Sequence, residues 1–104
     1  MGNIPPYKYH VSIANEKEIK QKDWFFDWQE EFEAERTIFK LTDIENEIVG
    51  LISMEHLFDH VFVHAIERQE KFKGQKITPY LFAIASLWSN HLGYDSGFSF
   101  EAKT

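Results

Sequence analysis

Cysteine is absent from the 104-residue sequence, and its absence excludes several kinds of site at once. A chain without cysteine has no disulfide, no zinc–thiolate centre, no iron–sulfur cluster and no thiol nucleophile. A small secreted scaffold built on disulfides is excluded as well, so we expect a protein of the reducing cytoplasm.

Long apolar runs and an excess of positive charge are also missing. No stretch approaches the ~18 apolar residues of a membrane span, and the opening MGNIPPYKYH lacks the apolar core of a signal peptide. We therefore expect no membrane contact. Eleven Lys and Arg stand against 17 Asp and Glu, a formal net charge of −6, which argues against a nucleic-acid partner.

The remaining composition is that of a small globular domain. Aromatic residues make up 16% of the chain, a share that argues against disorder. The length suits one domain, which we expect to span residues 1–104. Residues 1–6 are expected to form a loose arm, because Pro5 and Pro6 fit neither a strand ladder nor a helix interior.

Alternating apolar and polar residues predict strands over residues 7–13, 37–42 and 97–102, and runs that are apolar on both faces predict interior strands over 48–54 and 61–66. Asn15 and Glu18 have the spacing of a capping box, which predicts a helix to about Ala34 or two shorter helices. Thr78 as N-cap and Pro79 at N1 predict a helix that stops at Gly93. Gly50 marks a bulge or a close approach. The acidic run 30–35 is expected to be a solvated face.

The resulting order β-α-β-β-β-α-β predicts an α+β fold. Three of its strands form an antiparallel meander, and the last strand–helix–strand unit joins parallel strands. The aromatic cluster at residues 24–28 is expected to cover this sheet, although it is also a candidate interaction face.

A basic loop precedes the last helix. Four of the eleven basic residues lie within 68–76, where only Glu70 offsets them. The loop leads into a helix N-terminus, whose free N–H groups and dipole favour an anion, and Gly74 would admit a phosphate to the backbone. The alternative is a solvated loop without a ligand. The basic residues are Arg68, Lys71, Lys73 and Lys76.

Glu67 lies at the carboxyl end of a strand expected in the sheet interior, where open sheets bind their ligands. A carboxylate at this position is a candidate general base. The alternative is a surface glutamate paired with Arg68 or Lys71.

Three histidines recur at intervals of four residues. On a helix His56, His60 and His64 would share a face suited to a transition metal. The segment VFVHAI has strand character instead, and on a strand the three would not converge. We therefore expect no metal site.

Several blocks of the sequence occur in a familiar order. They are FDW (26–28), IFKL (38–41), IVGLISMEH (48–56), VFVHAIE (61–67) and the segment 81–104. Over roughly residues 22–104 the sequence resembles the GCN5-related N-acetyltransferase (GNAT) family. More narrowly, it is similar to bacterial GNAT-like proteins often described as toxin components of toxin–antitoxin systems.

The resemblance implies a fold, a reaction and a ligand. The fold is a GNAT-like mixed, mostly antiparallel sheet with flanking helices. The reaction is N-acyl transfer from acetyl-coenzyme A (acetyl-CoA) to a primary amine on a small molecule or peptide, with Glu67 as the base. The implied coenzyme contacts are Ile66, Lys71, Lys73, Gly74, Gln75, Lys76, Ile77 and Thr78.

Two departures from the family pattern support a second hypothesis. The phosphate-binding loop of the family carries two small residues, of which at most Gly74 remains, and family members continue beyond the fifth strand. We therefore expect a domain truncated after that strand. Such a module would be non-catalytic and would bind a partner or form a homodimer through the uncovered strand edge.

Overall fold

The computed structural model describes residues 3–4, 9–72, 74–94 and 98–103, which form one six-stranded sheet. The strands follow one another in space in chain order, and all neighbours are antiparallel except the last two, which are parallel. The sheet confirms the predicted α+β fold, the meander and the parallel final pair. The strands are β1 (Asn3–Ile4), β2 (Tyr9–Ile13), β3 (Thr37–Asp43), β4 (Ile48–His56), β5 (Val61–Arg68) and β6 (Phe98–Lys103).

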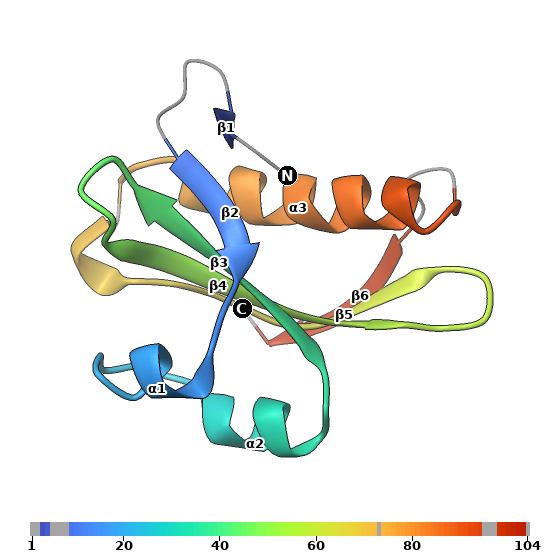
Figure 1. Cartoon of the computed structure of the whole chain (residues 1–104), viewed down its shortest axis with the longest axis horizontal. Coiled ribbons are helices and arrows are strands. Elements are labelled where there is room, and N and C mark those ends of the chain that lie inside the picture. Colours follow the sequence, from blue (N-terminus) through green and yellow to red (C-terminus); the bar gives the residue numbers. More distant parts are fainter. Residues whose placement is uncertain (1–2, 5–8, 73, 95–97, 104) are drawn as a thin grey trace.

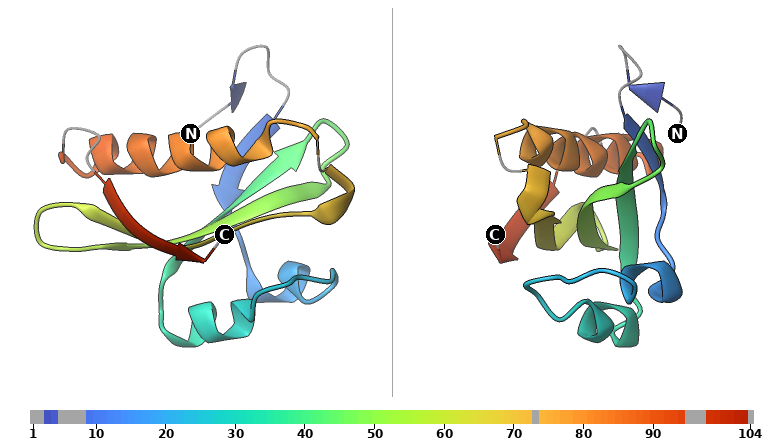
Figure 2. Two further views of the ribbon diagram at one scale, coloured as in Figure 1. Left: turned by 180° about the vertical axis from the view of Figure 1, so that it is seen from behind. Right: turned by 90° about the vertical axis from the view of Figure 1, so that its left-hand side faces the viewer.

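Helices cover both faces of the sheet (Figure 1). Helix α3 (Ile77–His91) lies on one face, and α1 (Glu16–Ile19) and α2 (Trp28–Glu33) lie on the other. Figure 2 shows the sheet between these two helical layers from the side.

The N-terminal part departs from the expectation in its first residues and decides between two alternatives for its helical region. Asn3 and Ile4 of the expected loose arm pair with His10 and Tyr9 as strand β1, while the rest of the arm lies outside the described residues. The first helical region consists of two short helices, the second of the two alternatives that its pattern allowed. The predicted capping box at the start of α1 is confirmed, since Asn15 and Glu18 exchange hydrogen bonds of 2.9 and 3.0 Å.

The start of α3 corrects the predicted cap. The N-cap is Lys76, and it makes no side-chain capping bond, so Thr78 is the second helical residue and Pro79 the third. Proline is tolerated there because the first turn has no intrahelical partner for its missing N–H. The predicted stop is confirmed, because Gly93 follows the C-cap with a φ of 89°.

The sheet has an apolar cluster on each face. Along β4 and β5, Ile52 and Ile66 pack with α3, whereas Leu51 and Ala65 pack with α1 and α2. Side chains of successive strand residues point to opposite faces, so an interior strand that is apolar throughout contributes to both clusters. The strand prediction for 48–54 rested on this pattern, and β4 is buried from Ile48 to Met54.

Gly50 of β4 lies where α3 comes nearest to the sheet. A methyl group at this position would lie 3.1 Å from Leu81 Cδ1, 3.3 Å from Ile77 Cγ2 and 3.2 Å from the Glu67 carbonyl oxygen. The register of β3 and β4 shifts beside it. Both predicted meanings of this glycine, a bulge and a close approach, are therefore confirmed.

Candidate functional site

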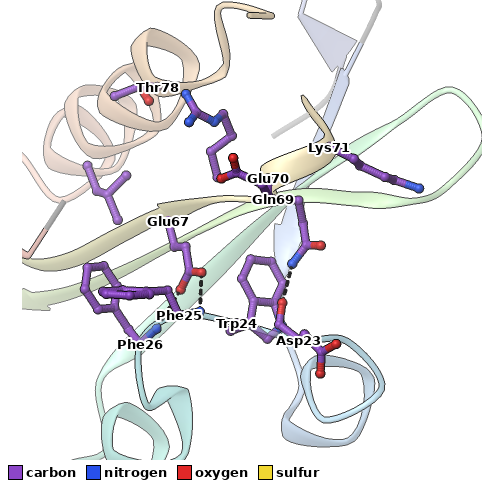
Figure 3. Close-up of a pocket in the computed structure, with 11 residues that line it drawn as sticks. Asp23, Trp24, Phe25, Phe26, Glu67, Gln69, Glu70, Lys71 and Thr78 are labelled. Carbon is purple, nitrogen blue, oxygen red and sulfur yellow. Dashed lines mark hydrogen bonds between the residues drawn. The ribbon is translucent and has the colours of Figure 1, made fainter. Parts of the chain in front are cut away.

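A pocket of about 760 Å³ opens at the carboxyl end of β5, a volume typical of small-molecule sites. Its walls come from three parts of the chain: the loop between α1 and α2, the end of β5 with the 3-10 helix η1 (Glu70–Phe72), and the first turn of α3. Figure 3 shows this arrangement. The lining residues are Asp23, Trp24, Phe25, Phe26, Ile66, Glu67, Arg68, Gln69, Glu70, Lys71 and Thr78.

Glu67 joins the loop wall of the pocket to the sheet. Its Oε2 accepts a hydrogen bond of 2.5 Å from the Phe25 N–H, and its Oε1 accepts bonds of 3.1 Å from the Phe26 N–H and 2.8 Å from Trp28 Nε1. Gln69 adds a bond of 2.9 Å from its Nε2 to the Asp23 carbonyl. These contacts hold residues 23–26, which lie between α1 and α2 and outside both helices.

The geometry explains why a carboxylate stands at position 67. Trp28 is 3% exposed, and a buried indole N–H needs an acceptor. Phe25 and Phe26 precede α2, so their N–H groups lie outside its hydrogen-bonding pattern. The sequence-based alternative paired Glu67 with Arg68 or Lys71, but the donors to its carboxylate are Phe25 and Phe26 of the loop and Trp28 of α2.

The aromatic loop itself was missed as part of a site. Residues 24–28 were expected to cover the sheet, which is true of Trp28, but the Phe25 side chain is 88% exposed at the pocket. A local signal was present, because Asp27 is a second N-cap whose Oδ1 accepts from the Glu30 N–H. Recognising this second cap would have placed residues 20–26 in a loop between two helices.

Lys71, a predicted coenzyme contact, lines the pocket and is paired with a carboxylate outside it. Its Nζ donates to Glu47 of the β3–β4 turn, which also pairs with Lys22 at 3.5 Å. The hydrogen bond from Lys71, with the charge of Lys22, holds the pKa of Glu47 below its ordinary value. Figure 3 shows the Lys71 side chain pointing away from Thr78.

The other predicted coenzyme contacts are spread over the pocket, the surface and the core. Ile66 and Thr78 line the pocket. Gln75 is exposed and its Oε1 accepts from Tyr9 Oη at 3.1 Å, while the exposed Lys76 is the N-cap of α3. Ile77 is fully buried in the apolar cluster, and its N–H donates to the Gln75 carbonyl at 2.8 Å.

Two further predicted contacts lie in the loop before α3. Lys73 lies outside the described residues. Gly74 has a φ of 95° with open space around it, so the backbone conformation favours glycine there.

Arg68 also lines the pocket, although sequence reasoning named it only as one of the basic residues and as a possible partner of Glu67. It is partly buried, and its Nε is buried without a hydrogen-bond partner in the described part of the chain. No sequence motif identifies an unpaired arginine, because whether its side chain is paired depends on where the nearby acidic residues find their own partners.

Glu31 corrects the expectation of a solvated acidic face. It is 2% exposed and accepts hydrogen bonds of 2.8 Å from Arg36 Nη1 and 2.7 Å from Ser53 Oγ. Burial raises the pKa of this carboxyl, but the bonds from Arg36 and Ser53 outweigh burial and leave the pKa below its ordinary value. The bond from Ser53 fixes α2 to β4, and the ion pair with Arg36 joins α2 to the segment before β3.

The histidines take separate partners. The strand prediction for VFVHAI is confirmed by β5, in which His64 is the extra residue of a bulge opposite β4. His64 Nε2 lies 2.9 Å from Glu55 Oε1, His60 Nδ1 lies 2.7 Å from Asp59 Oδ1, and His56 contacts the Trp88 ring. Among the described residues, no group of three His, Asp or Glu side chains could hold a metal ion.

The helices are short or amphipathic. Within the described segments, none has the length and apolar character needed to cross a bilayer.

No family model and no curated protein matches the sequence. Comparison with solved structures, however, identifies the architecture: the chain has a GNAT-like fold, a mixed and mostly antiparallel sheet with flanking helices. One similar structure is the aminoglycoside antibiotic 6'-N-acetyltransferase AAC(6')-Ih from Acinetobacter baumannii. It matches at a TM-score of 0.61 and 12% identity, covering 90% of this chain and 79% of that one.

A second similar structure is AAC(6')-Iy, in complex with the bisubstrate analog CoA-S-monomethyl-acetylneamine. It matches at a TM-score of 0.60 and 12% identity, covering 92% of this chain and 79% of that one. The same enzyme in complex with CoA matches at a TM-score of 0.55 and 11% identity, covering 90% of this chain and 78% of that one. At these identities the likeness establishes the fold.

Proposed function

We propose that the chain is a GNAT-type N-acyltransferase that moves an acetyl group from acetyl-CoA to a primary amine. The observation that carries the proposal is the pocket at the carboxyl end of β5, which combines Glu67 and Arg68 between an aromatic loop and α3. Its fold is shared with aminoglycoside N-acetyltransferases, one of which is bound to a CoA-containing bisubstrate analog. Fold alone does not determine activity, so the residues of the pocket carry the argument.

The described residues suit a thioester co-substrate with an anionic tail. The pocket is large enough for the acyl and adjoining parts of such a molecule. Arg68 has a buried, unpaired Nε, the kind of atom that a bound anion satisfies. We propose that Ile66 contacts the apolar portion, and that the first turn of α3 from Lys76 to Thr78 faces the phosphates.

The pocket also suits an amine that arrives as a cation. Asp23, Glu67 and Glu70 bring carboxylates to its lining, and Trp24 and Phe25 bring aromatic rings. Carboxylates attract a protonated amine, and ring faces attract it further. The similar structures with named acceptors are aminoglycoside acetyltransferases, whose acceptors are amines.

Glu67 is the proposed base. Its Oε2 accepts one hydrogen bond, from Phe25, and so retains a lone pair for a proton of the amine or of a bridging water. The freed amine attacks the thioester carbonyl, forming the C–N bond as the C–S bond breaks. The nitrogen loses a proton and the departing thiolate gains one, so the products are the N-acetyl amine and CoA.

The test compares Glu67→Gln with wild type and with Glu33→Gln, an exposed α2 residue that matches the change in charge. Glutamine retains an oxygen acceptor for Phe26 and Trp28 and removes the acceptor of Phe25. We expect turnover with a panel of amines, followed as thiol release, to fall by about 10²–10⁴-fold in Glu67→Gln. Acetyl-CoA affinity, measured by calorimetry, should stay within about twofold.

The outcomes distinguish a base from a loop anchor. If Glu67→Gln lowers turnover and removes one limb of the pH–rate profile while tryptophan emission is unchanged, Glu67 acts as the base. A lowered turnover accompanied by a shift in tryptophan emission assigns Glu67 to anchoring. Equal turnover removes Glu67 from the mechanism, and a folded wild-type chain that does not bind acetyl-CoA refutes the proposed function.

A second candidate function is a non-catalytic module that forms a homodimer through β6. The observation in its favour is that β6 pairs only with β5 among the described residues, which leaves one edge of the strand open to pairing. Sedimentation equilibrium of the full chain tests it. A dimer that does not bind acetyl-CoA supports this candidate, and a strict monomer rejects it.

A further inference from the structure

We propose that Arg68 binds a phosphate group of the coenzyme through its guanidinium, an inference that rests on the proposed function. The side chain of Arg68 makes no ion pair and no hydrogen bond within the described part of the chain. Its Nε is nevertheless buried. Buried donors without partners are rare in native proteins because each loses its hydration without compensation, so an anion from outside the chain is the expected partner.

The pleat of β5 directs Arg68 and Glu67 to opposite faces. Ala65 packs with α1 and α2, and Ile66 packs with α3. Continuing this alternation, Glu67 faces the aromatic loop, where its hydrogen bonds are observed, and Arg68 faces α3. The charges of Glu67 and Arg68 are therefore separated by the strand, the first beside the loop wall and the second beside the start of α3.

Space for a ligand beside Arg68 is the pocket that this residue lines. In the β4–β5 register Arg68 lies opposite Gly50, on which Leu81 and Ile77 of α3 pack. Thr78, from the first turn of α3, lines the same pocket. A group bound to the guanidinium would thus also lie near the first turn of the helix.

Arg68 is the lining cation without a counter-ion in the described residues. Lys71 lines the pocket as well, but its ammonium group is paired with Glu47. Guanidinium presents a planar fork of N–H donors that matches two phosphate oxygens, which a single ammonium does not. The chain has a net charge of −6, so an anion is attracted to the pocket only where a positive charge such as that of unpaired Arg68 offsets it locally.

The experiment uses the full chain as wild type, Arg68→Met and Lys17→Met, an exposed lysine on α1 that matches the loss of charge. Each protein is titrated calorimetrically with acetyl-CoA and with S-acetylpantetheine, which has the same thioester arm but no phosphate. We expect Arg68→Met to weaken acetyl-CoA binding by about 10–100-fold and S-acetylpantetheine binding by less than about twofold. Lys17→Met should bind both ligands as wild type does.

The Tm of thermal unfolding distinguishes a binding role of Arg68 from a structural role, because loss of a structural residue would lower it. Methionine removes the unpaired buried Nε and keeps most of the apolar stem, so the Tm of Arg68→Met should equal or exceed that of wild type. A lower Tm together with an equal loss of affinity for both ligands assigns Arg68 to the fold and overturns the inference.

Failure of the inference is distinct from failure of the proposed function. If wild type and Arg68→Met bind acetyl-CoA equally, the role of Arg68 is wrong and the proposed function stands. If wild type binds no acetyl-CoA, the proposed function is wrong, and inorganic pyrophosphate becomes the probe for Arg68. Pyrophosphate binding that Arg68→Met abolishes retains the phosphate site, and no binding overturns it.

Discussion

Replacing Glu67 with alanine should destabilise the protein, because the carboxylate anchors the wall of the pocket. The change removes two part-buried hydrogen bonds, from Phe26 and Trp28, and one exposed bond from Phe25. Bonds to a charged group contribute about 1.5 kcal/mol each at the lower end of the usual range, and an exposed interaction contributes little. The free energy of unfolding should therefore fall by about 3 kcal/mol, a large share of the ~5–15 kcal/mol of a typical domain.

Urea unfolding followed by tryptophan emission measures this loss, with Glu70→Ala as the control. Glu70 lines the same pocket from η1 and is exposed, so its removal should change the free energy of unfolding by less than about 0.5 kcal/mol. A double-mutant cycle with Trp28→Phe isolates the indole bond, and we expect a coupling of about 1 kcal/mol. A loss below about 1 kcal/mol in Glu67→Ala, or no coupling, would refute the anchoring role.

Two further predictions concern the contacts of the sheet with the helices on its two faces. Gly50→Ala should lower the free energy of unfolding by about 1–3 kcal/mol in the same urea assay. The added methyl group would lie 3.1 Å from buried Leu81 and 3.2 Å from the Glu67 carbonyl oxygen. An unchanged unfolding midpoint would contradict the close approach. Glu31, whose pKa is lowered because bonds from Arg36 and Ser53 outweigh burial, stabilises the protein when ionised. Its contribution is full above the ordinary glutamate pKa and is lost as the pH falls through the lower pKa of the folded state. The stability advantage of wild type over Glu31→Gln should therefore be full at pH 7 and shrink as the pH falls below about 4; an advantage independent of pH would refute the ion pair.

The elements that sequence reasoning predicted well are those encoded locally. Alternation located β3 and an apolar run located β5, each to within two residues, while the Asn15–Glu18 box located the start of α1 and Gly93 located the end of α3. Each signal lies within the element it describes. The cap of α3 was wrong by two residues, because Thr78 and Pro79 are compatible with several positions in the first turn.

The contacts of the site were beyond such reasoning because they join distant segments. Lys71 was expected to serve an anion, but its partner Glu47 lies in a turn between two other strands. Glu31 sits in a run of charges that is typical of a solvated surface, and only the meeting of α2 with Ser53 of β4 buries it. The position of Glu67 at a strand end was predictable, whereas its three donors were not.

The wall of the pocket is tied to the sheet by bonds between residues 39 to 42 positions apart in the chain. Helices of four and six residues, such as α1 and α2, are too short to persist alone. We therefore expect residues 20–28 to become ordered after β5 has paired with β4, because so distant a contact requires a long loop to close. Local unfolding of this segment opens the pocket while the sheet persists, so a ligand that fills the pocket slows hydrogen exchange first at the Phe25 and Phe26 amides.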